Sequence, residues 1–116
     1  RLRETLVFEL VPQPGDMEAN RIPERLGEAD VVALTATSLI NHTFSDVMQW
    51  IRKDAFVVLL GPSTPLYPRL FDFGIDALCG SVVTDSHRAM EMMQQAAPFR
   101  KLEGIEHVML LKEDAP

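Results

Sequence analysis

The chain has a single cysteine among its 116 residues. This one thiol, Cys79, excludes an internal disulfide framework and fits the reducing cytoplasm, where we expect the protein to lie. Long apolar runs are also missing: none approaches the roughly 20 residues that cross a bilayer, and no signal peptide is visible. We therefore expect no membrane partner.

Basic residues are scarce relative to acidic ones. The chain has 11 Lys and Arg against 17 Asp and Glu, a net charge of −6 and a pI near 4.9. Because nucleic acids attract clustered Lys and Arg, we expect no nucleic-acid partner. With 47% hydrophobic residues, the chain is long enough for one globular domain. It begins with Arg1 and not with Met, which predicts a fragment or a processed piece.

Common phosphate-binding and nucleophile motifs are absent. Neither Gly-x-x-x-x-Gly-Lys-Ser/Thr nor Gly-x-Gly-x-x-Gly occurs, and Pro62 and Pro65 remove N–H donors that a phosphate loop would use. Ser63, His42 and Asp76 or Asp85 could supply a catalytic triad. However, no Gly-x-Ser-x-Gly turn presents the serine, so the catalytic residues stay unassigned.

Metal-ligand spacings are absent too. The chain has no His-x-x-x-His and no Cys-x-x-Cys. His42 and Cys79 could approach each other, but two ligands are fewer than the three or four of a tight site. A small buried thiol is the commoner role for Cys79, and core filling is the simplest role for Met90, Met92 and Met93. The metal ligands are therefore also unassigned.

Apolar runs alternate with helix-like segments along the chain. Strands are expected at residues 5–11, 30–36, 56–60, 75–79 and 107–111, and helices at 23–29, 43–53, 65–73 and 86–97. This alternation predicts an α/β fold with a mostly parallel sheet of about five strands. The unbroken apolar row at residues 31–34 is typical of a strand covered on both faces, and so predicts a three-layer sandwich.

Three strand ends rich in small and hydroxyl residues would meet at one edge of this sheet. They are residues 35–38 with Asn41 and His42, residues 61–64, and residues 80–85, where 80–83 is expected to be a turn. Ligands bind at this carboxyl edge in open α/β sheets. The N-termini of the following helices could hold an anion there.

Helix capping is the competing interpretation of the same residues. Thr64 before Pro65 is a good N-cap and first-turn pair, and Thr43 and Asp85 can cap their own helices. Gly74 is expected to end the helix at residues 65–73. The two interpretations stay open at this point. The meeting of three strand ends at one edge favours a binding site, whereas each turn taken alone favours a helix cap.

The motifs taken together resemble the putative heavy-metal chelatase family, a domain-of-unknown-function group with an enolase-N-like first half and a Rossmann-like second half. The segments that carry the resemblance are Phe8-Glu9-Leu10, Pro14-Gly15-Asp16, Ala29-Asp30-Val31-Val32, Asn41-His42-Thr43, Leu60-Gly61-Pro62-Ser63-Thr64-Pro65, Phe71-Asp72-Phe73-Gly74 and Gly80-Ser81-Val82-Val83-Thr84-Asp85. They span nearly the whole chain. Cys79 departs from the pattern, because a small residue such as alanine is expected there.

The resemblance implies a Rossmann-like domain with a ligand site between the two halves. Its contributors from this side would be Glu9, Asp16, Asn41, Gly61, Ser63, Thr64, Ser81 and Asp85. The ligand would be a small anionic or metal-chelating molecule. The resemblance names no cofactor, and a divalent metal ion is one candidate.

The same resemblance implies that the enolase-N-like half and the first strand of the Rossmann-like half lie outside this chain. Whether the domain catalyses a reaction stays open. The alternative to a ligand-binding half is a non-catalytic sensing or scaffold domain that forms a homo-oligomer through an open sheet edge.

Overall fold

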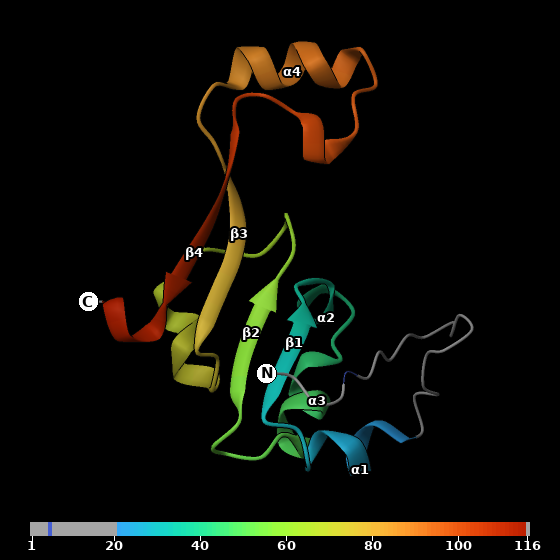
Figure 1. Cartoon of the computed structure of the whole chain (residues 1–116), viewed down its shortest axis with the longest axis vertical. Helices are drawn as coiled ribbons and strands as arrows, with labels where there is room; N and C mark the ends of the chain where they lie inside the picture. Colours follow the sequence, from blue (N-terminus) through green and yellow to red (C-terminus); the bar gives the residue numbers. More distant parts are fainter. Residues whose placement is uncertain (1–4, 6–20, 116) are drawn as a thin grey trace.

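The computed structural model describes residue 5 and residues 21–115. Four strands lie in this part of the chain: β1 (Val31–Thr35), β2 (Phe56–Leu60), β3 (Ala77–Val83) and β4 (Ile105–Leu111). The helical elements are α1 (Ile22–Leu26), α2 (Thr37–Ile40), α3 (Phe44–Trp50), the 3₁₀ helix η2 (Pro68–Phe73), α4 (Ser86–Gln94), η3 (Phe99–Lys101) and η4 (Lys112–Asp114). Figure 1 shows their arrangement around one sheet.

The four strands form a single sheet in the order β1-β2-β3-β4. β1 pairs parallel with β2 and β2 with β3, whereas β4 pairs antiparallel with β3. The expected α/β class with a mostly parallel sheet is confirmed. Apart from Thr5, the predicted strand at residues 5–11 lies outside the described residues, so the fifth strand stays a prediction.

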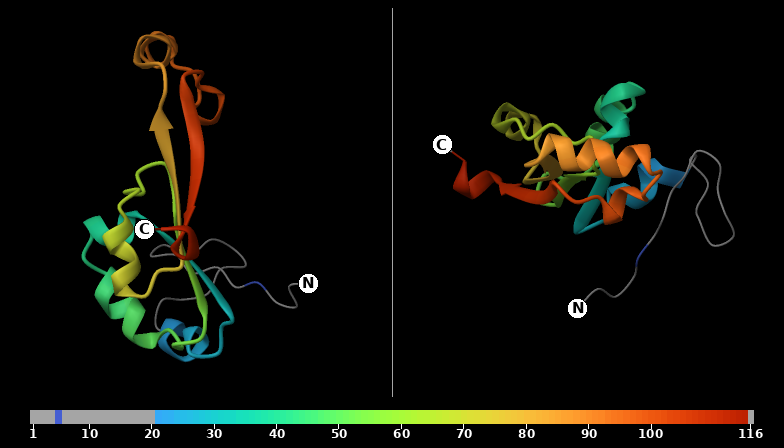
Figure 2. Two further views of the ribbon diagram at one scale, coloured as in Figure 1. Left: turned by 90° about the vertical axis from the view of Figure 1, so that its left-hand side faces the viewer. Right: turned by 90° about the horizontal axis from the view of Figure 1, so that it is seen from above.

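The hydrophobic core lies on one face of the sheet. Val57, Leu59 and Leu78 are buried there. Side chains from α2, α3, η2 and nearby loops pack against them, including Leu39, Phe44, Met48, Leu66, Leu70 and Phe71. Alternate strand residues point to the two faces of a sheet, so this side receives every second residue of each strand. These helices therefore form one layer beside the sheet, as Figure 2 shows from the side.

The opposite face is open on β1 and β2. Val31 pairs with Phe56 across the two strands, and their side chains are 53% and 45% exposed. Leu60, four residues after Phe56 on the same face of β2, is 37% exposed. The apolar row at 31–34 was expected to be covered on both sides, and within the described residues it is covered on one. An unbroken apolar row indicates that both faces avoid water, but it cannot say which part of a protein covers them.

β3 is longer than expected and forms an arm with β4. The last pair between β2 and β3 joins Leu60 to Cys79, and beyond it the residues of β3 pair only with β4. This two-stranded ribbon leaves the sheet and carries α4 and η3 at its tip (Figure 1). The expected turn at residues 80–83 is therefore wrong, because these residues continue the strand.

Gly80 explains why the turn prediction failed. A Cβ atom added there would stand 2.8 Å from the Thr64 backbone oxygen and 3.1 Å from Leu66 Cδ2. The glycine thus permits the loop after β2 to lie directly on the strand, which is a second common role of glycine within strands.

The ends of the helices confirm two of the four predicted caps, Gly74 and Asp85. Thr43 stands at the N-cap position of α3 but its side chain makes no capping hydrogen bond. Gly74 ends η2 in the left-handed conformation at φ 92°, and the Asp85 side chain accepts a hydrogen bond from the Arg88 N–H at the start of α4. The helix expected from residue 65 begins instead at Pro68, so Thr64 is not its N-cap. Tyr67 is held extended because the residue before a proline avoids the helical conformation.

Candidate functional site

The carboxyl ends of β1, β2 and the paired part of β3 lie at one level. Thr35 pairs with Leu60, and Leu60 pairs with Cys79. Immediately past this level the Ala36 N–H donates to the Leu60 carbonyl oxygen over 2.9 Å. The loops that leave β1 and β2 therefore start side by side, which is the arrangement expected of a ligand-binding edge.

An open pocket of about 460 Å³ lies where this edge meets the arm. Gly61 and Pro62 form the wall on the β2 side, and β3, β4 and η3 form the rest. The full lining is Gly61, Pro62, Cys79, Gly80, Ser81, Phe99, His107, Val108 and Met109. Its walls are mostly apolar, with a few polar groups, as is common for small-molecule sites.

The polar groups of the pocket are held by contacts across the arm. Ser81 and His107 are directly paired on β3 and β4, and Ser81 Oγ lies 3.1 Å from His107 Nδ1. The Phe99 ring lies 6.0 Å from the His107 ring, between centroids, at an angle of 54°. The imidazole is thus fixed on two sides, by a hydrogen bond at one nitrogen and by an aromatic ring.

A buried hydroxyl lies behind the pocket wall. Thr64 is 4% exposed, and its Oγ1 has no hydrogen-bond partner among the described residues. It lies 3.9 Å from the position that a Cβ of Gly61 would take. Ser38, in α2 after β1, also has a buried hydroxyl without a partner. Each such hydroxyl lowers stability, because its lost hydration is not replaced.

The turn at the end of β2 depends on Gly61. Its φ is 125°, a left-handed value that L side chains rarely adopt, and the Thr64 N–H donates to its carbonyl oxygen over 3.1 Å. Glycine reaches this conformation without steric cost. The first wall of the pocket is therefore built by a glycine turn.

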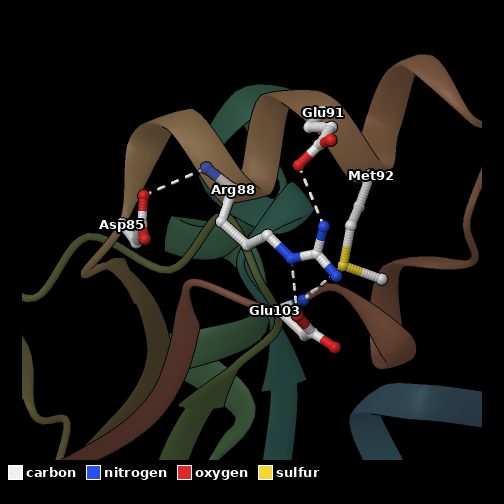
Figure 3. A network of polar contacts seen from close by, with 5 residues as sticks. All are labelled: Asp85, Arg88, Glu91, Met92 and Glu103. Atoms are coloured by element: carbon white, nitrogen blue, oxygen red, sulfur yellow. Dashed lines mark hydrogen bonds and ion pairs between the residues drawn. The ribbon is translucent and has the colours of Figure 1, made fainter.

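The main charge network lies at the tip of the arm, away from the pocket wall formed by β2. Arg88 donates to Glu103 over 2.6 Å and to Glu91 over 2.9 Å, while the Glu103 N–H contacts Met92 Sδ (Figure 3). The hydrogen bond from Arg88, and then its charge, lower the pKa of Glu103. The hydrogen bonds to Glu103 and Glu91 raise the pKa of Arg88. These contacts stiffen the tip and place no charge in the pocket.

The structure brings some of the predicted site residues together. Gly61 and Ser81 line the same pocket, and Thr64 lies directly behind Gly61. Ser63 is exposed and does not line the pocket. Glu9 and Asp16 lie outside the described residues.

Two further predicted residues lie elsewhere. Asn41 Oδ1 accepts hydrogen bonds from the N–H and hydroxyl of Thr43, at 3.2 and 2.7 Å, so it stabilises a local turn. β3 carries Val83 about 13 Å beyond Cys79 at about 3.3 Å per residue, and Asp85 follows it to the tip.

The local geometry gives little support to an anion held by helix N-termini. α2 has only four residues, and η2 begins three residues after Pro65. At α4 the Asp85 carboxylate already occupies the N-terminus. A short helix has a small dipole, and a carboxylate cap repels a second anion. Any ligand at this edge would therefore be held mainly by the pocket.

Sequence reasoning missed the contribution of β4. His107 and Met109 enter the pocket because β4 runs antiparallel to β3, with Ser81 opposite His107 and Cys79 opposite Met109. The closing strand was predicted, but its direction was not. A helix followed by a return strand can pair in either direction, so the sequence held no clear signal for this pairing.

Among residues 5 and 21–115, no three His, Cys, Asp or Glu side chains converge into a group that could hold a metal ion. No helix in the same residues is long and apolar enough to cross a membrane.

Comparisons with known proteins give one consistent result. The model of the family DUF364, described as "Putative heavy-metal chelation", matches residues 1–112. A DUF364 protein of unknown function from Desulfitobacterium hafniense is 29% identical with a TM-score of 0.79, covering 92% of this chain and 44% of its own. One from Pyrococcus horikoshii is 20% identical with a TM-score of 0.74, covering 91% and 46%. This chain thus spans less than half of either protein. No curated protein matches it.

Proposed function

Because this chain belongs to the DUF364 family, we propose that it is a Rossmann-like domain that binds a small anionic or metal-chelating molecule at the carboxyl edge of its sheet. The observation that carries the proposal is the pocket in which Gly61 and Ser81 meet. These two residues come from different strands, Gly61 from the turn after β2 and Ser81 from within β3, and both were expected to contribute.

The chemistry of the pocket suits an organic chelate better than a bare phosphate. Its lining is largely apolar, and Ser81 and His107 supply polar groups that face each other over 3.1 Å. An apolar wall contacts the carbon skeleton of a ligand, and a few fixed polar groups orient its oxygens. Thr64 would contribute from behind Gly61.

The open sheet face supports a second part of this proposal, that the domain works beside another, enolase-N-like part. Val31, Phe56 and Leu60 form an exposed apolar strip on that face, with the half-buried Val58 between Phe56 and Leu60. Strips of this kind mark surfaces that pack against another part of a protein or a partner. Whatever reaction the whole assembly catalyses, this chain would supply one wall of the site.

The experiment is a thermal-shift titration with two anionic chelators, citrate and 2,3-dihydroxybenzoate, each alone and as its Fe(III) complex. A ligand that binds the native state raises Tm, by an amount that grows with the logarithm of its concentration once this exceeds Kd. We expect at least one probe to raise the Tm of the wild type and to lose most of this effect in Ser81→Ala.

Ser86→Ala is the matched control, since Ser86 is an exposed serine at the start of α4 on the arm tip. It should respond to the probes as the wild type does. Equal Tm shifts in Ser81→Ala and Ser86→Ala, or no shift with any probe, would contradict the proposed site.

A further inference from the structure

Three side chains with soft or borderline donor atoms lie together in the pocket. Cys79 and Met109 are directly opposite each other on β3 and β4, and His107 is two residues from Met109. Since strand residues two apart share a face, all three point to the same side of the arm. All three also line the pocket.

We propose that Cys79, His107 and Met109 bind a soft monovalent metal ion, Cu(I). This inference rests on the proposed function, because it names a metal class for the same pocket. The thiolate, the thioether and the imidazole would each supply one ligand. Cys79 departs from the residue expected at its position from the family resemblance, so the site is a feature of this chain.

The register brings the donor atoms within reach of one ion. Side chains directly opposite in an antiparallel pair have Cβ atoms about 4.5–5.5 Å apart, and diagonal neighbours are within reach of long side chains. Cys79 and Met109 are such a direct pair, and Cys79 and His107 are diagonal neighbours. A metal ion held about 2.3 Å from sulfur can bridge side chains at these separations.

The imidazole is already oriented for this role. Ser81 Oγ lies at Nδ1, which leaves Nε2 at the far end of the ring as the metal-binding nitrogen. Phe99 packs beside the same ring. Histidine ligands are commonly fixed in this way by a hydrogen bond at their other nitrogen.

The donor set selects the class of metal. Thioether and thiolate sulfur favour soft ions such as Cu(I), whereas carboxylate and carbonyl oxygens favour hard ones. No carboxylate from residues 21–115 lines the pocket. Within the same part of the chain no three His, Cys, Asp or Glu side chains converge, which argues against a divalent site, whereas the thioether of Met109 is a donor for soft ions.

The donors are also accessible to an ion from solvent. Met109 is 63% exposed although it is apolar, and Cys79 is half-buried. Binding replaces the thiol proton: the S–H bond breaks, the Cu–S bond forms, and one proton is released to solvent with no change of oxidation state.

The test is an anaerobic competition titration in which the chain competes with bicinchoninate for Cu(I). The variants are Cys79→Ser, Met109→Leu, His107→Gln and Met90→Leu. Met90 is the matched control, because it is 58% exposed on α4 and does not line the pocket. Denaturant unfolding of each variant checks that it is folded.

We expect one Cu(I) per wild-type chain and a loss of affinity of at least about tenfold in each of the three pocket variants, with Cys79→Ser the weakest. Met90→Leu should bind as the wild type does. Equal affinities for Met109→Leu and Met90→Leu would overturn the inference, as would a wild type that does not compete for Cu(I).

The chelator titration separates this inference from the proposed function. If the chelators raise Tm through Ser81 but the chain does not bind Cu(I), the result supports the proposed function and refutes the metal site. If the chain binds Cu(I) through Cys79 but the chelators cause no Ser81-dependent rise in Tm, the result supports the metal site and refutes the proposed function.

Discussion

Cys79 and Met109 face each other across β3 and β4, at the level where β2 makes its last pair with β3. The thiol and the thioether therefore stand at the junction of the sheet and the arm, beside the glycine turn at the end of β2. This pair gives the pocket its soft-donor chemistry. It exists because the chain returns from α4 antiparallel to β3.

Replacing Thr64 by valine should stabilise the free protein. The hydroxyl is buried without a partner, and valine keeps nearly the same shape without the unsatisfied group. We expect the free energy of unfolding to rise by up to about 1 kcal/mol. Urea unfolding measures it, with Thr84→Val, an exposed threonine after β3, as the control. A fall of 1 kcal/mol or more would show that the hydroxyl has a partner.

Gly104→Ala should destabilise the arm tip. Gly104 has φ 79°, and an added Cβ would stand 2.4 Å from the Asp85 carbonyl oxygen. We expect a loss of more than about 1–2 kcal/mol, the cost of a left-handed alanine alone. Gly27→Ala is the control. Gly27 has φ −64°, and a Cβ atom added there would lie 3.6 Å from its nearest neighbour, the Glu24 backbone oxygen. Similar unfolding midpoints for the two variants would refute this explanation.

The ion pair between Arg88 and Glu103 should make stability depend on pH on the acid side. Arg88 lowers the pKa of Glu103 below its ordinary 4.5 in the folded state. The stabilisation is thus fully present above pH 4.5 and is lost as pH falls through the lowered value. We expect Glu103→Gln to flatten the decline of the urea midpoint between about pH 5 and pH 3 at low salt.

Glu106→Gln is the control for that measurement. Glu106 is an exposed residue of β4 on the same arm, whereas Arg88 donates to Glu91 and Glu103. The urea midpoint of Glu106→Gln should fall with decreasing pH as steeply as that of the wild type. If the midpoint of Glu103→Gln falls equally steeply, the ion pair does not stabilise the tip.

Phe56→Ser should reduce binding of the dye ANS by the chain. Phe56 lies in the exposed apolar strip with Val31 and Leu60, so its loss interrupts that strip. Phe73→Ser is the control, because Phe73 is 64% exposed on η2 outside that strip. A larger fluorescence loss in Phe73→Ser than in Phe56→Ser would contradict the open-face description.

Strands and helix ends could be predicted wherever residues close in the sequence determine them. The apolar runs at β1 and β2, the αL glycine Gly74 and the Asp85 cap each follow from neighbouring residues, and the structure confirms them. Pro68 was the local signal that was overlooked, because it holds Tyr67 extended and delays the helix after β2.

The rest depended on contacts between distant segments. Gly80 permits a loop to lie on a strand, and only the position of Thr64 and Leu66 shows this. Likewise, the pairing of Cys79 with Met109 spans 30 residues and follows from the direction of β4. The edge of the sheet and two of the residues that line the pocket, Gly61 and Ser81, could be predicted, but the arm that completes the pocket could not.

We propose the pocket between Gly61 and Met109 as the binding site of this chain. The most direct measurement is a ¹H–¹⁵N NMR titration of the labelled chain with Ag(I), a diamagnetic soft ion that stands in for Cu(I). We predict that the amide shifts concentrate at Gly61, at residues 79–81 and at residues 107–109. Shifts centred instead on α4, around Met90 and Met93, or spread evenly over the chain, would contradict the claim.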